Sequence, residues 1–216
     1  MTAHCTSADT PRPHRKLDRY RPDDEARAFL DSQLVGHLAY VSAGGRPHAV
    51  PMMYARVGDV VYLHGSTGAG TALRTRGGPL PASFSVTSVE GLVLARAAVH
   101  HSLQFRSVVV HGELSTVTDE HAKRVAFDVL VDAVAAGRSA QCRPASSKEL
   151  ASTAVLALSM DQVDHKARLH GVVDDAEDLA LPFWAGVVPL AVVAGEPQPD
   201  AGVSGRAAPA GCWPSG

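Results

Sequence analysis

The chain has 216 residues, a formal net charge of -2 and 45% hydrophobic residues, and these values exclude several classes of protein. A nearly neutral charge gives no overall attraction to nucleic acid or to an anionic membrane, and no stretch approaches the roughly 18 consecutive apolar residues of a membrane span. The three cysteines are far apart and fit neither a disulfide framework nor a zinc site, so a reducing cytoplasm is the expected compartment.

Both ends of the chain are predicted to lie outside the folded domain. Residues 193–216 are rich in Gly, Ala and Pro and hold few bulky apolar residues, a composition typical of disordered tails. Residues 1–21 hold scattered basic residues and lack the apolar stretch of a signal peptide. We therefore predict a disordered arm over 1–21, one folded domain over 22–192 and a disordered tail over 193–216.

The domain is predicted to open with a short amphipathic helix and to continue with strands. Pro22 followed by three acidic residues is a favourable helix start, because proline suits the first turn and acids suit the positive end of the helix dipole. After Gly36, runs rich in β-branched and aromatic residues alternate with turn signals at 43–46 and 57–59. The predicted strands are 37–43, 47–57, 59–65, 81–95, 105–117 and 153–163.

One long helix is predicted between the fifth and sixth strands. Thr118 can cap it, apolar residues from Ala122 to Val134 recur at the spacing of a buried face, and Gly137 ends it. Strands that follow one another through short turns indicate antiparallel pairing. Six such strands close most easily into a small barrel, so we predict a mainly β, six-stranded antiparallel barrel with flanking helices, α+β overall.

A glycine-rich loop after the third predicted strand is the first candidate binding site. Glycines let backbone amides crowd around an anion, and a helical turn at 71–76 adds the partial positive charge of its N-terminus. The loop matches neither a nucleotide-binding P-loop nor a Rossmann turn, so a phosphate site and a flexible surface loop both remain open. Its candidate residues are Gly65, Ser66, Thr67, Gly68, Gly70, Thr71, Arg74 and Arg76.

The strand around Pro51 is the second candidate. Proline cannot donate a ladder hydrogen bond, so its place in mid-strand implies an edge or a bulge, where backbone groups are free to bind something else. Met52, Met53 and Tyr54 would then offer polarizable and aromatic surface to a flat ring. The alternative is that these side chains fill the core.

Arg106 and Ser107 form the third candidate. An arginine at the start of a valine-rich strand either lies on the surface or reaches a phosphate with its forked, always charged head. Ser107 faces the opposite way on a flat strand, so the two residues could contact one ligand only at a bulge or at the strand's end.

Together these segments resemble a known family. The runs over 46–54, 61–65, 83–95, 101–113 and 178–190 occur in an order that resembles the pyridoxamine 5'-phosphate oxidase-like flavoproteins, in the branch with the nitroimidazole-resistance proteins. The similarity extends over about residues 26–190. It implies an FMN-binding split β-barrel, built as a homodimer with flavin sites at the subunit interface.

The resemblance also implies roles for individual residues. The family's phosphate site corresponds to Gly65, Ser66, Thr67, Gly70, Thr71 and Arg74, closed by Arg106 and Ser107. The backbone of Pro51, Met52, Met53 and Tyr54 corresponds to the strand beside the isoalloxazine ring. His64 matches the active-site histidine of the nitroimidazole-resistance branch, and Trp184 lies in the segment that reaches toward the partner's flavin. Thr71 departs from the family pattern, which often has a basic residue there.

The implied function is that of an FMN-dependent oxidoreductase, nitroreductase-like, acting on a small flat substrate. His64 would either donate a proton to the substrate or only hydrogen-bond the cofactor. The alternatives are a haem- or deazaflavin-binding split barrel, with His100, His101 or His111 as the axial haem ligand, and a non-catalytic flavin-binding protein. The expected partners are the substrate and a second copy of the chain, with no nucleic acid and no membrane.

Overall fold

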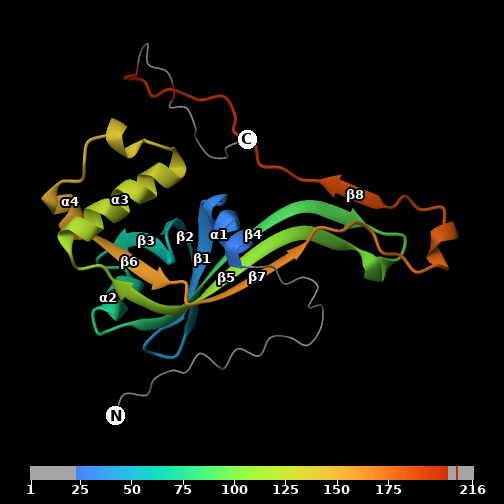
Figure 1. Ribbon diagram of the computed structural model, residues 1–216, viewed down its shortest axis with the longest axis horizontal. Helices are drawn as coiled ribbons and strands as arrows, with labels where there is room; N and C mark the ends of the chain where they lie inside the picture. Colours follow the sequence, from blue (N-terminus) through green and yellow to red (C-terminus); the bar gives the residue numbers. More distant parts are fainter. Residues whose placement is uncertain (1–22, 204–207, 209–216) are drawn as a thin grey trace.

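The computed structural model describes residues 23–203 and 208 and is built around an antiparallel barrel (Figure 1). The strands are β1 Val35–Val41, β2 Pro47–Val57, β3 Val60–Ser66, β4 Leu80–Leu94, β5 Ser102–Thr116, β6 Thr153–Ser159, β7 Gln162–Arg168 and β8 Gly186–Pro189. The helices are α1 Asp23–Asp31, α2 Gly70–Thr75, α3 Glu120–Val134 and α4 Ser147–Ser152, with short 3-10 turns η2 Ala98–His100, η3 Ser139–Gln141 and η4 Asp178–Ala180. No helix among these described residues is long and apolar enough to cross a membrane.

Six of the strands close into a ring. Around the ring β5 pairs with β4, β4 with β1, β1 with β2, β2 with β3, β3 with β6, and β6 again with β5, every pair being antiparallel. The predicted six-stranded antiparallel barrel with flanking helices is confirmed. The described sheet has eight strands, because β7 adds to β5 and β8 adds to β4.

The predicted strand over 153–163 is in fact two strands. β6 ends at Ser159, and the chain turns through Met160, whose amide donates to the carbonyl of Asp59 at 2.8 Å. β7 then runs back along β5, which pairs with β7 over 105–111 and with β6 over 114–116. One edge of β5 therefore serves two successive strands.

The barrel core is sealed by α1. Phe29 and Leu30 of α1 belong to the same buried cluster as the inward-facing residues of the strands, among them Phe84. Tyr54 meets Phe84 edge to face with ring centroids 5.0 Å apart, and its hydroxyl donates to the carbonyl of Leu30 at 2.5 Å. Burial in this apolar surrounding raises the pKa of Tyr54 well above its ordinary value.

The long helix begins one residue later than predicted. Asp119, and not Thr118, is its N-cap, because a carboxylate oxygen of Asp119 accepts the amide hydrogen of Ala122 at 2.7 Å. α3 ends at Val134, and Gly137 lies in the following turn with a φ of 72°. The first helix, α1, begins at Asp23, and Pro22, its predicted first residue, lies outside the described residues.

β4 and β5 continue beyond the barrel as a long two-stranded arm (Figure 1). Their register shifts once, between Val89 and Gly91, and β8 pairs with the outer part of β4. Near the tip, Arg96 forms an ion pair with Asp174 at 2.9 Å. The exposed apolar residues of the arm and of the segment that returns along it include Leu92, Val99, Leu103, Leu179, Phe183 and Trp184. The homodimer stays a prediction, and this surface is where a second copy would have apolar area to cover.

The predicted tails fall largely outside the described part of the chain. The predicted arm over 1–21 lies entirely outside it. Of the predicted tail over 193–216, the stretch 193–203 is described and contains neither a helix nor a strand. The prediction of disorder in both ends therefore stays a prediction.

Gly36 of β1 lies against the ring of Phe84, and this contact gives a direct test of the fold. A Cβ atom on Gly36 would lie 2.3 Å from Cζ of Phe84 and 2.9 Å from the carbonyl oxygen of Ser85. We expect Gly36→Ala to lower the free energy of unfolding by about 1–3 kcal/mol, because a packed core and a backbone atom must both move. Gly44→Ala, with nothing within 4 Å of the added atom, is the matched control. Equal denaturant midpoints for the two variants would contradict this packing.

Candidate functional site

β2 and β3 separate near the middle of β2. They pair from Tyr54 opposite Leu63 to Val57 opposite Val60, whereas the part of β2 from Pro47 to Met53 pairs only with β1. In the part of the chain that the structure describes, this half of β2 is a sheet edge. The prediction that Pro51 lies on an edge is therefore confirmed.

Pro51 also determines which backbone groups point to this edge. Residues along an antiparallel strand alternate between hydrogen-bonded and non-hydrogen-bonded pairs, and Pro51, opposite His37, has no N–H to give. The same alternation directs the N–H and C=O groups of Met53 away from β1. Tyr54, one residue later, points its amide the other way and donates to the carbonyl of Leu34 at 3.4 Å. Met53 thus directs its amide toward the point where the strands part.

The side chains of this segment differ in what they can offer a ligand. Pro51 is exposed and Met53 is 37% exposed, whereas Met52 packs against the core and Tyr54 is buried. The core-filling alternative therefore describes Met52 and Tyr54. A flat ligand at this edge would contact the backbone of the strand and the side chains of Pro51 and Met53.

His64 lies on β3, one residue beyond the last pair that β3 forms with β2. Its backbone pairs with Val155 of β6, and its ring centroid is 6.4 Å from that of Phe127 on α3. The Nδ1 atom of His64 is buried and has no hydrogen-bond partner among the described residues. A buried polar atom in that state is destabilising unless water or a ligand satisfies it. Nδ1 of His64 is thus a buried binding group that no described residue uses.

The glycine-rich loop uses several of its polar groups internally. The amides of Gly68 and Ala69 donate to the side-chain and backbone oxygens of Ser66, at 3.2 and 2.9 Å. The amide of Thr67 donates to the carbonyl of Ser152 at 3.1 Å. The amides that remain for a ligand are those at the start of α2, since Ala69 at the N-cap has no capping side chain.

The cations of the loop also differ. Arg74 is exposed, and among the described residues it takes part in no ion pair, whereas Arg76 donates to the carbonyl of Thr67 at 3.2 Å. Thr71 is buried and contributes no charge. Arg74 is therefore the arginine of this loop whose guanidinium has no hydrogen-bond partner among the described residues.

Arg106 and Ser107 do not converge. β5 runs through both without a break, with Arg106 opposite Ser88 and Ser107 opposite Thr87, and the register shift lies farther along β4. The two side chains consequently project from opposite faces of the sheet. The Nε atom of Arg106 lies 2.8 Å from a carboxylate oxygen of Glu90, so this guanidinium is paired within its own chain.

Trp184 lies on the arm, away from the place where β2 and β3 of its own chain part. Its side chain is exposed and folds over Gly186 of β8, where an added Cβ would lie 2.8 Å from Cη2 of the indole. β8 in turn pairs with β4, Gly186 being opposite Leu94. The predicted contact of Trp184 with a partner's flavin stays a prediction.

The three histidines considered as haem ligands all have partners. Nε2 of His100 lies 3.2 Å from a carboxylate oxygen of Asp175, and Nδ1 of His101 lies 3.1 Å from the carbonyl of Ala97. Nδ1 of His111 lies 2.9 Å from the hydroxyl of Ser83. Each of these three rings has a hydrogen-bond partner within the chain, whereas Nδ1 of His64 has none among the described residues.

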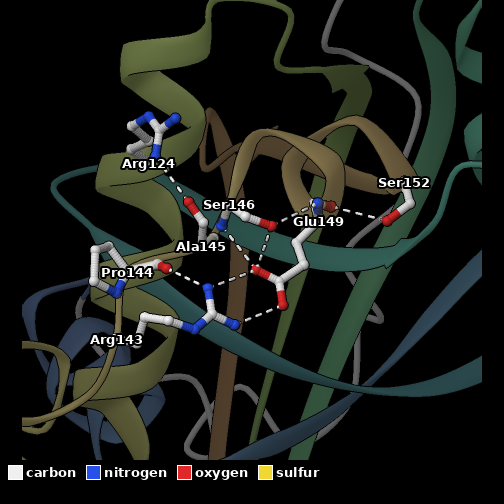
Figure 2. A network of polar contacts seen from close by, with 7 residues as sticks. All are labelled: Arg124, Arg143, Pro144, Ala145, Ser146, Glu149 and Ser152. Atoms are coloured by element: carbon white, nitrogen blue, oxygen red, sulfur yellow. Dashed lines mark hydrogen bonds and ion pairs between the residues drawn. The ribbon is translucent and has the colours of Figure 1, made fainter.

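A polar network lies at the start of α4, the helix whose last turn contacts the loop (Figure 2). α4 carries Ser152, the residue that accepts the amide of Thr67. At its N-terminus the hydroxyl of Ser146 accepts the amide of Glu149 at 3.3 Å, and a carboxylate oxygen of Glu149 accepts the amide of Ser146 at 2.7 Å. Arg143 donates to both carboxylate oxygens of Glu149, at 2.8 and 3.0 Å. These bonds, that of Arg143 foremost, lower the pKa of Glu149 to about 2.

We expect Glu149→Gln to loosen α4, because the amide side chain loses the ion pair with Arg143. Hydrogen exchange of the amides in 146–152 should become faster at pH 7, with that of Thr67 following. Since the folded pKa lies below the ordinary value of 4.5, the contribution of this carboxylate to stability is present above pH 4.5 and is lost as the pH falls through about 2. Melting temperatures of the two proteins should therefore converge toward pH 2.

Glu196→Gln, at an exposed position outside all helices and strands, is the control for this change. It should leave exchange in 146–152 as it is in the original chain. Unchanged exchange in Glu149→Gln would show that the capping network does not hold the loop.

Comparison with known proteins agrees with this fold. A family model described as pyridoxamine 5'-phosphate oxidase matches residues 22–167. The FAD and haem binding protein from Mycobacterium smegmatis is 35% identical, with 88% of this chain and 93% of that chain covered and a TM-score of 0.81. The flavocytochrome Anf3 from Azotobacter vinelandii is 31% identical, with 94% of each chain covered and a TM-score of 0.85.

A more distant structure shares the fold alone. It is a candidate 5-nitroimidazole antibiotic resistance protein from Bacteroides thetaiotaomicron, 17% identical, with 68% of this chain and 85% of that chain covered and a TM-score of 0.59. A search of curated proteins finds no significant match to this chain.

Proposed function

The chain belongs to the pyridoxamine 5'-phosphate oxidase family, and we propose that it is a redox protein that binds a flavin and a haem. The observation that carries the proposal is the buried, unpartnered nitrogen of His64 beside the gap between β2 and β3. Two relatives share about a third of their residues with this chain over nearly its whole length. One is named an FAD and haem binding protein, and the other is named a flavocytochrome.

His64 is the proposed axial ligand of the haem. Imidazole nitrogen is a common haem ligand, and a ligating histidine must have a nitrogen free of other bonds. His111 has both ring nitrogens beside oxygens of this chain, and His100 and His101 lie at the tip of the arm with one nitrogen engaged. Nδ1 of His64, in contrast, is buried within the fold and has no partner among the described residues. The residues present thus fit the group, with Phe127 supplying apolar surface beside the ring.

The flavin is proposed to lie along the free edge of β2. Isoalloxazine has hydrogen-bond acceptors on its rim, and the outward amide of Met53 would donate to one of them. Its phosphate would lie at the start of α2, beside Arg74, in the loop formed by Gly65, Ser66, Thr67, Gly70 and Thr71. Arg106 and Ser107 are left out of the phosphate site in this proposal, because Glu90 pairs the first and the second projects from the other face.

FAD is proposed in preference to the FMN predicted from the sequence. The monoester phosphate of FMN carries close to two negative charges, and the loop has a buried threonine where a basic residue was expected, while Arg76 already donates to the carbonyl of Thr67. The phosphates of FAD are diesters with one charge each, spread over two groups, and they demand less concentrated positive charge. FAD is also the flavin in the name of the protein from M. smegmatis.

The proposed activity is that of an oxidoreductase. When bound, the flavin would supply two-electron chemistry and the haem one-electron chemistry, while the protein positions both. The side chains of this chain would bind and orient the two groups and exclude water from the gap between β2 and β3. A small flat substrate, as predicted from the sequence, remains part of this proposal.

Replacing His64 tests the haem assignment. Protein purified after supplementation with a haem precursor should show flavin bands together with a Soret band. We expect His64→Ala to lose most of the Soret absorbance and to keep the flavin bands, because only the axial ligand is removed. His121→Ala, at an exposed position on α3, is the control and should keep both. A full Soret band in His64→Ala would show that another residue ligates the haem.

Two arginine variants test the phosphate assignment. We expect Arg74→Ala to weaken flavin binding roughly tenfold, as the loss of one charge-assisted hydrogen bond predicts. The double variant Arg106→Ala, Glu90→Gln removes both members of an ion pair and should change affinity far less. Fluorescence titration of the flavin-free protein with FAD and FMN measures both. The reverse order would show that Arg106 leaves Glu90 to bind the phosphate.

A further inference from the structure

A broad cavity of about 940 Å³ lies at one end of the barrel, and of the residues considered for a cofactor only His111 lines it. Its walls come from the β1–β2 hairpin, from the inner ends of β4 and β5 and from the turn between β6 and β7. Its lining includes the aromatic, polar and acidic side chains of Tyr40, His48, Ser83, His111, Glu113 and Asp161.

One wall carries a chain of three polar side chains across neighbouring strands. Ser83 of β4 is paired with His111 of β5, and its hydroxyl lies 2.9 Å from Nδ1 of the imidazole. Nε2 of His111 lies 3.6 Å from a carboxylate oxygen of Asp164 on β7. The carboxylate favours the proton of the neutral ring on Nε2, so we assign Nδ1 as the acceptor for the Ser83 hydroxyl. The oxygen lone pairs of Ser83 are then left to accept a hydrogen bond from a ligand.

The charges of the cavity all have one sign. Glu113 and Asp161 line it, both exposed, and neither a lysine nor an arginine is among its lining residues. Two carboxylates at the mouth of a concave surface attract cations and repel phosphates. The cavity therefore differs in electrostatic preference from the loop that carries Arg74.

A flat aromatic surface stands in the same cavity. The rings of Tyr40 and His48 are stacked, with centroids 5.0 Å apart and planes 10° from parallel. Such a pair forms a rigid surface on which another flat ring or a cationic group can pack. Tyr40 also borders the glycine-rich loop, because its hydroxyl lies 3.4 Å from the position of a Cβ on Gly70.

We propose that this cavity is a binding site for a small protonated aromatic amine. The ring of the amine packs on Tyr40 and His48, its ammonium group is neutralised by Glu113 and Asp161, and Ser83 accepts a hydrogen bond. Aromatic surface, acceptor and negative charge come from five different strands or turns. The site is separate from the proposed cofactor positions and does not depend on them.

Three probes that share an indole ring and differ in charge test the proposal on the full chain. Tryptamine is the cation, tryptophol the neutral alcohol and indole-3-propionate the anion, and isothermal titration calorimetry gives their affinities. We expect tryptamine to bind about tenfold more tightly than tryptophol, and the anion to bind least, since only the cation gains from two carboxylates.

Two conservative variants locate the binding. Glu113→Gln and Asp161→Asn should each weaken tryptamine binding by about fivefold, the upper range for a solvent-exposed charge pair, and leave tryptophol unchanged. Glu25→Gln, an exposed acid on α1, is the matched control and should change neither. Absorption spectra of each variant show separately whether flavin and haem are retained.

The proposal is overturned if tryptamine does not bind at millimolar concentration or binds no better than tryptophol. It is also overturned if both carboxylate variants bind tryptamine as the original chain does. Circular dichroism melts of the variants distinguish loss of binding from loss of folding.

Discussion

The missing amide of Pro51 is the constraint on which the arrangement of the site depends. Because Pro51 faces its edge without a donor, a strand running beside it could not complete the ladder there. β3 accompanies β2 only up to Tyr54 and then continues with β6 alone. The barrel closes through β6 and β5, and Met53 and His64 lie where β2 and β3 part.

The gap has rigid boundaries because α3 and α4 are tied to the strands behind it. The ammonium group of Lys123 on α3 donates to the carbonyls of Leu150 and Thr153, at 2.6 and 2.8 Å, and so joins α3 to the end of α4 and the start of β6. The last turn of α4 accepts the amide of Thr67. One connected set of hydrogen bonds thus holds α3, which carries Phe127, and the glycine-rich loop in place. A site that is already ordered loses less conformational entropy when a ligand binds.

Sequence patterns predicted the strands and their closure because both depend on local alternation and short turns, as in β1 and β2. They did not predict what depends on register between distant strands. The pairing of Arg106 with Glu90 follows from the register of β4 and β5, and burial of Tyr54 follows from the position of α1. Thr118 and Asp119 are adjacent, and both are favourable N-cap residues. Only the geometry of the helix decides which of them caps α3.

The unpartnered nitrogen of His64 could be found only from coordinates, since it depends on where α3 packs. The sequence signal was the position of His64 at the end of a strand next to a glycine-rich loop. For the amine cavity no signal existed, because Ser83, His111 and Asp164 come from three separate segments joined by pairing across the sheet. Isolated serines and histidines in strands are common, and their chemistry appears only when register aligns them.

The loop with Arg74 and the cavity with Glu113 and Asp161 have opposite charge and share Tyr40 as a boundary. Opposite fields keep the ligands of the two places distinct, since a phosphate is repelled where an ammonium is attracted. If the two places are coupled, Tyr40 is the side chain between them, because it belongs to the aromatic pair of the cavity and its hydroxyl lies beside Gly70. By thermodynamic reciprocity, any factor by which one ligand changes the affinity of the other must be the same in both directions.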